Sequence, residues 1–176
     1  MKKRFPLSKV YSLLEPGPLL LLTTAHRNAS DVMPMTWYSL LAFEPPQVAC
    51  VVSAGNHSQA LLRASKACVL NIPTVELAKQ VVGCGNCSGA EVDKFAKFAL
   101  SCSAAEQVAA PLLDDCFASL ECRVVDTGLR RYEQFVLEVV AAWVDPKVKD
   151  PRTLHHRGYG KFMVAGESIK LRSRMR

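Results

Sequence analysis

Hydrophobic and polar positions divide the chain into short apolar runs that are separated by turn-forming residues. The runs that predict strands lie at residues 19–25, 32–43, 47–53, 67–72, 117–125, 133–144 and 161–164. Helical spacing is confined to short segments at residues 7–14, 58–65, 74–82 and 91–98. Strands in close succession with only short helices predict a mainly β fold, an antiparallel barrel or sandwich, rather than a parallel α/β sheet.

The length of 176 residues predicts one domain that spans residues 1–176 and buries a sizeable core. The formal net charge of +6 comes partly from basic clusters at the two ends, Lys2 to Arg4 and Lys170 to Arg176. No aromatic residue interleaves with either cluster, so the sequence does not favour a nucleic-acid partner. Residues 1–6 and 168–176 are expected to be solvated ends that can fray.

The sequence predicts neither a membrane span nor a signal peptide. The apolar run at residues 19–22 is far shorter than the roughly 20 residues that a bilayer span needs. Pro6, Ser8 and Glu15 interrupt any signal-peptide core. The seven cysteines are odd in number and do not have the spacing of a compact disulfide framework. We therefore expect a cytoplasmic protein without a membrane partner.

The motif Cys84-Gly-Asn-Cys87 is open to several interpretations: half of a zinc site, a dithiol redox pair, or two thiols without a role. A zinc site needs further ligands, and the sequence has no second Cys-x-x-Cys and no histidine pair at zinc-finger spacing. A thioredoxin-like pair is expected to open a helix, whereas this motif ends a helical segment. The interpretation without a role is favoured, and no metal site is predicted.

His57 and Ser58 stand at the predicted start of a helix that follows a strand. Unpaired N–H groups and a partial positive charge make a helix N-terminus a natural phosphate site. The alternative is an exposed turn histidine beside a plain helix cap. Lys94 either supplies a charge to the same phosphate or is a solvated helix lysine. The pair His155-His156 is a further acid–base or metal candidate, although neighbouring strand residues point to opposite faces.

The stretch from Met33 to Pro46 combines aromatic and small polar side chains in a run that ends at a double proline. Hydroxyl and backbone groups can bond the edge of a flat aromatic ligand, while aromatic and thioether surfaces contact its face. The sequence has no Gly-x-Ser-x-Gly elbow, no Gly-x-Gly-x-x-Gly turn and no Walker loop. The stretch therefore predicts a binding wall rather than a hydrolase site.

Together these features resemble the flavin reductase-like family of FMN-binding split barrels, which includes the flavoredoxins. The matching segments are, in chain order, Leu22-Thr23-Thr24, Met35-Thr36-Trp37, Glu44-Pro45-Pro46, the turn from Ser53 to Ser58, Asn71-Ile72-Pro73, the motif from Gly85 to Phe95, and the segment from Gly158 to Phe162. The resemblance covers about residues 15–167, and it rests on the order and spacing of these motifs.

This resemblance implies a homodimer of antiparallel Greek-key split barrels with FMN near the subunit interface. It implies that the flavin ring and ribityl chain are lined by Met35, Thr36, Trp37 and Ser39, and that the ribityl chain and phosphate are held by Ser53, Ala54, His57 and Ser58. Asn71 would continue that rim, Ser88, Gly89 and Lys94 would close over the phosphate, and Tyr159 or Phe162 would cover the ring. No catalytic side chain is implied, because the flavin itself carries the redox chemistry.

The activity that the resemblance implies is that of an FMN-dependent oxidoreductase. NAD(P)H would reduce FMN, and electrons would pass to free flavin, a metal complex or a protein. The alternatives are a flavoredoxin-like electron carrier without nicotinamide turnover and a metal-binding module built on Cys84 and Cys87. One departure lies at Asp31-Val-Met-Pro34, where many relatives carry an asparagine close to the flavin pyrimidine edge. Because Pro34 has no N–H to donate, we expect the flavin affinity or potential to differ.

Overall fold

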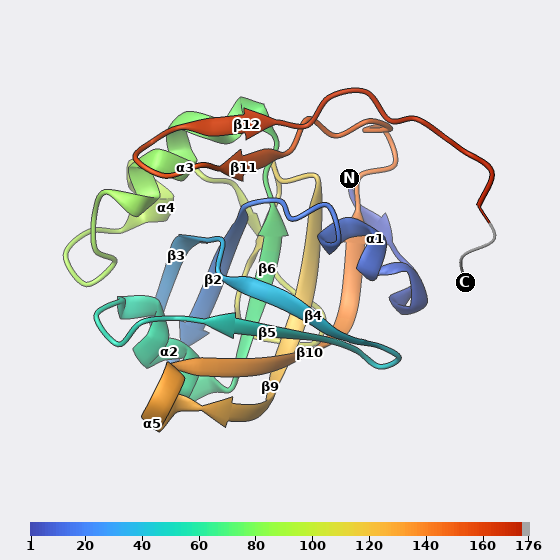
Figure 1. Cartoon of the computed structure of the whole chain (residues 1–176). Coiled ribbons are helices and arrows are strands. Elements are labelled where there is room, and N and C mark those ends of the chain that lie inside the picture. Colours follow the sequence, from blue (N-terminus) through green and yellow to red (C-terminus); the bar gives the residue numbers. More distant parts are fainter. Residues whose placement is uncertain (174–176) are drawn as a thin grey trace.

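A curved antiparallel sheet forms the body of the protein in a computed structural model that describes residues 1–173 (Figure 1). Within these residues eight strands form one sheet, with the path β3-β2-β6-β9-β10-β5-β4 and a short β1 paired to β10. The strands are β1 (Lys3–Arg4), β2 (Leu20–His26), β3 (Ala29–Met35), β4 (Tyr38–Phe43), β5 (Pro46–Val51), β6 (Ala67–Ile72), β9 (Ala118–Gly128) and β10 (Gln134–Val144). The predicted mainly β, antiparallel fold is confirmed.

Short helices and hairpins surround this sheet. The helical segments are η1 (Leu7–Lys9), α1 (Tyr11–Leu14), α2 (His57–Ser65), η2 (Val75–Leu77), α3 (Ala78–Gly85), α4 (Lys94–Lys97) and α5 (Leu129–Tyr132). Two small hairpins pair β7 (Cys102–Ser103) with β8 (Leu112–Leu113) and β11 (Leu154–His156) with β12 (Phe162–Val164). In Figure 1 the β11–β12 hairpin, drawn in red, lies along α3. None of the helices described in residues 1–173 is long and apolar enough to cross a membrane.

The stretch that the sequence predicts as one strand over residues 32–43 is two strands in the structure. β3 ends at Met35 and β4 begins at Tyr38, and these strands lie at opposite ends of the sheet path. At the break the Met35 side chain is buried, whereas the Trp37 side chain is 71% exposed. The Trp37 carbonyl accepts the Val51 N–H at 3.0 Å, which starts the pairing of the second strand. The prediction was wrong because apolar residues continue through the break, so the pattern does not show the change of partner.

Other boundaries also differ from the sequence-based expectation. Residues 126–128, which the apolar pattern leaves outside the predicted strands, are the end of β9, and α5 makes the connection to β10. α3 continues through Gly83 instead of ending there. A Cβ at Gly83 would lie 2.4 Å from the Phe98 ring, so this glycine serves close packing rather than helix termination. β11 is a strand that the sequence did not predict.

The N-terminal end pairs with the sheet. Lys3 pairs with Val144 and Arg4 with Trp143, and the Phe5 N–H donates to the Ala142 carbonyl at 2.8 Å. The backbone ladder and the contact of the Arg4 guanidinium with the Trp143 ring hold this end in place. At the other end residues 168–173 are exposed, and residues 174–176 lie outside the described part of the chain.

The apolar residues form two main clusters that position the site. One fills the concave side of the sheet and includes Leu22, Leu70, Leu120 and Phe135. The other lies between the sheet, α3 and the β11–β12 hairpin, where buried Leu21, Val32 and Val81 meet partly buried Phe162. Burial of each large aliphatic side chain contributes about 1.5–3 kcal/mol relative to exposure. The second cluster therefore fixes α3 and the hairpin against β3, and its residues Leu19, Val81 and Phe162 line a cavity between these elements.

Candidate functional site

Two adjoining hollows lie between β3, α3 and the loops around them. The apolar hollow, of about 310 Å³, is lined by Leu19, Pro34, Thr36, Val81, Val82, Gly85, Asn86, His156, Gly160 and Phe162. The polar hollow, of about 300 Å³, is lined by Asp31, Met33, Gly55, Asn56, His57, Gly85, Asn86, Cys87, Ser88, Gly89, Glu91 and Lys94. Gly85 and Asn86 line both, so the two hollows meet at the C-terminal end of α3.

A larger cavity of about 520 Å³ lies elsewhere, at the N-terminal end. Lys2 lines this cavity, and its ammonium group donates to the Leu113 carbonyl and, at 2.9 Å, to the Ser119 hydroxyl. None of the site residues that the sequence predicts lines it. The smaller joined hollows are therefore the candidate site.

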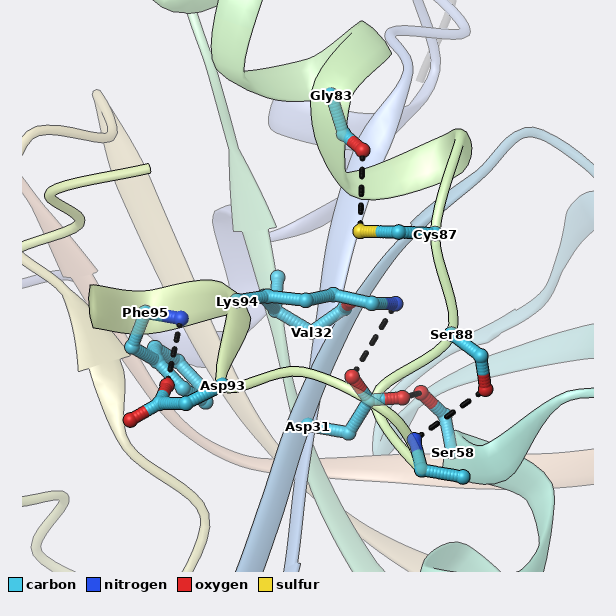
Figure 2. Close-up of polar contacts among 10 residues, drawn as sticks. Asp31, Val32, Ser58, Gly83, Cys87, Ser88, Asp93, Lys94 and Phe95 are labelled. Atoms are coloured by element: carbon cyan, nitrogen blue, oxygen red, sulfur yellow. Dashed lines mark hydrogen bonds and ion pairs between the residues drawn. The ribbon is translucent and has the colours of Figure 1, made fainter. Parts of the chain in front are cut away.

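The floor of the polar hollow is a buried network around Asp31 (Figure 2). Ser58 donates its hydroxyl hydrogen to Asp31 Oδ2 at 2.6 Å. Lys94 Nζ lies 3.2 Å from Asp31 Oδ1 and donates to the Val32 carbonyl at 2.8 Å. The Lys94 and Asp31 side chains are only 4% and 2% exposed. Because a buried charge is costly unless it is paired, each of these groups compensates the burial of the other.

Backbone geometry around the network brings Lys94 into this position. Asp93 caps α4 and accepts the N–H groups of Phe95 at 2.9 Å and Ala96 at 3.1 Å. Gly89 passes so close to the network that a Cβ there would lie 2.1 Å from Asp31 Oδ1. Only glycine fits at this point. The loop that closes the polar hollow is thereby fixed against β3.

The start of α2 forms the opposite wall of the polar hollow. Asn56 is the N-cap residue, but its side chain makes no capping hydrogen bond; its amide donates to the Ser53 carbonyl at 3.2 Å instead. The first N–H groups of a helix have no partner within the helix. His57 lines the same wall. These donors lie at the rim of the polar hollow, where an anion would be stabilised by the N-terminus of the helix.

Residues 13–163 match the model of the flavin reductase like domain. The chain belongs to this family. A solved structure with the same fold is the FMN-binding domain of a flavin reductases-like enzyme from Shewanella baltica OS155, which is 25% identical, has a TM-score of 0.92 and shares 98% coverage of both chains. The flavoredoxin of Methanosarcina acetivorans is also 25% identical, with a TM-score of 0.76 and coverage of 88% of this chain and 87% of that one. The uncharacterized protein YddH of Escherichia coli strain K12 is 28% identical over 172 residues, which are 89% of this chain and 91% of YddH.

The structure brings several of the predicted site residues of this flavin reductase-like chain together. His57, Ser88, Gly89 and Lys94 line the polar hollow, and Ser58 lies below it through its bond to Asp31. Two others line the apolar hollow: Thr36, the residue after β3, and Phe162, the first residue of β12. Ser58 is not the helix cap that the sequence suggested, because Asn56 holds that position. Lys94 is not a free cation either, because Asp31 already balances its charge.

Other predicted residues lie apart from the two hollows. The Met35 side chain packs in the core of the sheet, and the Tyr159 side chain is fully exposed at the tip of the β11–β12 hairpin. Trp37 and Ser39 are exposed at the start of β4, and Thr36 and Ser39 share a separate shallow hollow. Ser53 and Ala54 form the exposed turn before α2, where the Ala54 N–H donates to Glu133 Oε1 at 2.8 Å.

Asn71 is completely buried, and its side chain holds the sheet together. Its amide NH₂ donates to the Leu21 carbonyl and the Thr23 hydroxyl, both at 3.2 Å. Its carbonyl oxygen accepts the Leu113 N–H at 3.0 Å and the Ser119 hydroxyl at 2.7 Å. These bonds use the full capacity of the amide. The expectation that Asn71 continues the rim of a ligand site does not fit this placement.

Sequence reasoning did not assign Asn86 or His156 to the site, although both line the apolar hollow. Asn86 lies between Cys84 and Cys87, and a single asparagine at such a position has no local signature of ligand binding. His156 lies on β11, a strand too short to show a pattern. Asp31 was noted only as a departure from the family, and its sequence neighbours give no sign of the contact with Lys94.

The two cysteines of the motif differ in their surroundings. Cys84 lies in α3 and is buried, and burial raises the pKa of its thiol to about 11. Cys87 is half-buried, lines the polar hollow and donates its S–H to the Gly83 carbonyl at 3.4 Å. Residues 1–173 contain no cluster of three or more side chains that could hold a metal ion.

Proposed function

We propose that the joined hollows bind FMN, with the phosphate end in the polar hollow and the flavin ring directed toward the apolar hollow. The observation that carries this proposal is the continuity of the two hollows at Gly85 and Asn86. A ligand with an anionic end and a flat apolar end matches such a site. The FMN-binding domain from Shewanella baltica, with a TM-score of 0.92, supports the same assignment.

The chemistry of the donor set also supports FMN. The N–H groups at the start of α2, the His57 ring, the Asn56 amide and the Ser88 hydroxyl can all donate to a phosphate. Asp31 Oδ1 is buried, and Lys94 lies beside it, yet no hydrogen bond reaches it within residues 1–173. A hydroxyl group of the ribityl chain would supply one. The Asp31–Lys94 pair is neutral overall, so phosphate binding relies on dipoles and hydrogen bonds more than on a free lysine.

When bound, FMN supplies the redox chemistry, and the protein supplies binding and orientation. We infer that NAD(P)H is the reductant and that free flavin, a metal complex or a protein is the acceptor. A flavoredoxin-like carrier without nicotinamide turnover is the second candidate, and the likeness to the Methanosarcina acetivorans flavoredoxin favours it. Both candidates need the same cofactor site, so they differ only in the source of the electrons.

A homodimer with FMN near the interface is part of the proposal. Trp37, Leu41 and Phe43 are 71%, 53% and 63% exposed at β4, which is an end of the sheet path. Exposed aromatic and aliphatic residues in one patch are typical of a surface that a partner covers. Thr36, the neighbour of Trp37, lines the apolar hollow, so a partner on this patch would lie beside the flavin. The free thiols of the seven cysteines support a reducing compartment, the cytoplasm.

The experiment that tests the redox proposal is a visible spectrum of the purified protein, followed by anaerobic mixing with NADH and, separately, with NADPH. Flavin absorbance that bleaches on mixing supports the oxidoreductase. Flavin absorbance that persists with both nucleotides supports the carrier. Protein that shows no flavin bands and takes up no FMN contradicts both.

A further inference from the structure

His156 is the titratable side chain of the apolar hollow. The other lining residues are aliphatic, aromatic, glycine, or neutral and polar, the last being Thr36 and Asn86. His156 extends from β11 and is exposed to solvent as well as to the hollow. One wall of a cavity that is otherwise uncharged therefore carries a group that can hold or release a proton near neutral pH.

The two adjacent histidines of the hairpin have different surroundings. His155 lies within hydrogen-bond distance of the Gly17 carbonyl through Nδ1, at 3.0 Å, and of the Thr153 hydroxyl through Nε2, at 3.1 Å. The His156 ring has no hydrogen-bond partner within residues 1–173 and packs against the Phe162 ring, with centroids 5.3 Å apart and planes tilted by 48°. His155 thus fixes the hairpin to the chain near α1, whereas both ring nitrogens of His156 remain available.

We propose that the apolar hollow is the site of a small, flat quinone acceptor and that His156 is the catalytic proton donor to its carbonyl oxygen. This inference rests on the proposed function, because it needs a flavin ring that reaches the junction of the two hollows at Gly85 and Asn86 and leaves the part of the apolar hollow beside His156 and Phe162 to the acceptor. Leu19, Val81, Val82 and Phe162 offer apolar contact for a ring, and the hydrogen-bonding groups are few. Such a lining suits a neutral conjugated ring with carbonyl oxygens better than a charged acceptor.

The balance of the reaction requires a donor of this kind. A quinone becomes a hydroquinone by taking two electrons and two protons. NAD(P)H supplies, through the flavin, a hydride, which accounts for both electrons and one proton. The second proton passes from the protonated His156 imidazole to the quinone oxygen as the O–H bond forms. The neutral imidazole then takes a proton from solvent, which its exposure allows. The nicotinamide leaves oxidised.

The surroundings of His156 permit this cycle. Across the hollow, α3 presents Val81 and Val82, and β3 with the residue after it presents Pro34 and Thr36, none of which is titratable. The charged residues nearest to His156 in the sequence are Arg157 and Lys161, on its own hairpin. Their backbones close the turn, where the Arg157 N–H donates to the Lys161 carbonyl at 2.8 Å. The imidazole group of a histidine can donate a proton near neutral pH and is suited to general acid catalysis.

The kinetic test compares two acceptors of the NADH-reduced holoprotein in stopped flow. Duroquinone takes a proton with its electrons and, being fully substituted, does not add to thiols; ferricyanide takes electrons alone. We expect His156→Gln to lower the rate with duroquinone at least about tenfold and to leave the ferricyanide rate unchanged. In the wild type the duroquinone rate should fall as pH rises from 5.5 to 8, while the variant should be flat. His26→Gln, a histidine that lines neither hollow, is the control and should change neither rate.

An equal rate with duroquinone in His156→Gln, or an equal loss with both acceptors, would overturn the proton-donor role. A second measurement does not depend on flavin reduction. Duroquinone is titrated into FMN-free protein without NADH, and the ring C–H signals of His156 are followed by NMR. A saturable shift of these signals, absent in the signals of His26, supports the quinone site even if the flavin proposal fails. Unchanged His156 signals overturn the site itself.

Discussion

The Lys94 ammonium group lies 3.2 Å from the Asp31 carboxylate in the interior of the protein, with both side chains almost fully buried. This pair joins α4 to β3, and the Ser58 hydroxyl on the same carboxylate adds α2. All three elements contribute residues to the lining of the polar hollow or to the network below it. The ion pair is thus the structural support of the candidate phosphate site, although from the sequence Lys94 was assigned to the phosphate and Asp31 to no contact.

Removal of the lysine charge should destabilise the fold. Lys94→Met leaves the Asp31 carboxylate buried and unpaired, so the free energy of unfolding should fall by about 3–5 kcal/mol in urea denaturation. The double variant Asp31→Asn with Lys94→Met removes both charges and should recover most of this loss. A double variant that is no more stable than Lys94→Met would show that the charge pairing is not what the lysine contributes.

The close approach of Gly89 to Asp31 predicts that a single methyl group disturbs the site. Gly89→Ala places a Cβ 2.1 Å from the carboxylate, and the shift that follows should cost about 1–3 kcal/mol of stability. FMN binding, measured by the quenching of flavin fluorescence, should weaken as well. Gly55→Ala is the matched control, because Gly55 lines the same hollow and its Cβ would meet nothing within 4 Å. Equal FMN dissociation constants for the two variants would contradict the assignment of the closing loop.

The thiols predict a protection experiment. At pH 8 iodoacetamide should modify Cys87, which lines the polar hollow, and leave Cys84 unmodified. Cys84 is buried, and its thiol, with a pKa of about 11, forms little thiolate until the pH approaches that value. Saturating FMN should slow the modification of Cys87, as measured by peptide mass spectrometry. Cys102 reports non-specific effects, because it is exposed and lines neither hollow. Partial burial raises the pKa of its thiol to about 11, so its modification should be slow, and its rate should not depend on FMN. A Cys87 rate that FMN leaves unchanged would speak against a cofactor in this hollow.

The exposed face of β4 predicts the oligomeric state. The wild-type protein should have the mass of two chains in light scattering after size exclusion. Phe43→Asp places a charge on the patch with Trp37 and Leu41 and should shift the protein to one chain. Val125→Asp, on β9, changes a valine that is 50% exposed and should leave the dimer intact. A wild-type protein with the mass of one chain would contradict the proposed interface.

The succession of strands was predictable because turn residues and apolar runs mark it locally. The break at Thr36 and Trp37 was not, since a change of strand partner leaves the apolar pattern intact. The start of α2 was found as a phosphate candidate from His57 and Ser58, because a helix N-terminus has a local signature. The partners of Asp31 lie 27 and 63 positions along the chain, at Ser58 and Lys94, and such distant contacts have no local signal.

The roles of Asn71 and His156 could not be predicted from the sequence either: Asn71 was assigned to the site and serves the fold, whereas His156 was not assigned and lines a hollow. Asn71 is a polar residue in a family motif, yet its amide is consumed by bonds to Leu21, Thr23, Leu113 and Ser119. His156 lies in a short hairpin and faces the apolar hollow because β11 and β12 pack along α3. Whether a polar side chain serves the fold or a ligand depends on its packing partners, and these are set by the tertiary structure.

FMN binding in the joined hollows can be measured by a titration of FMN into cofactor-free protein, followed by flavin fluorescence, in the wild type and in Gly89→Ala. We expect saturable binding of one FMN per chain and weaker binding in the variant. Fluorescence that rises in proportion to added FMN, without saturation in the wild type, would show that the hollows do not bind FMN.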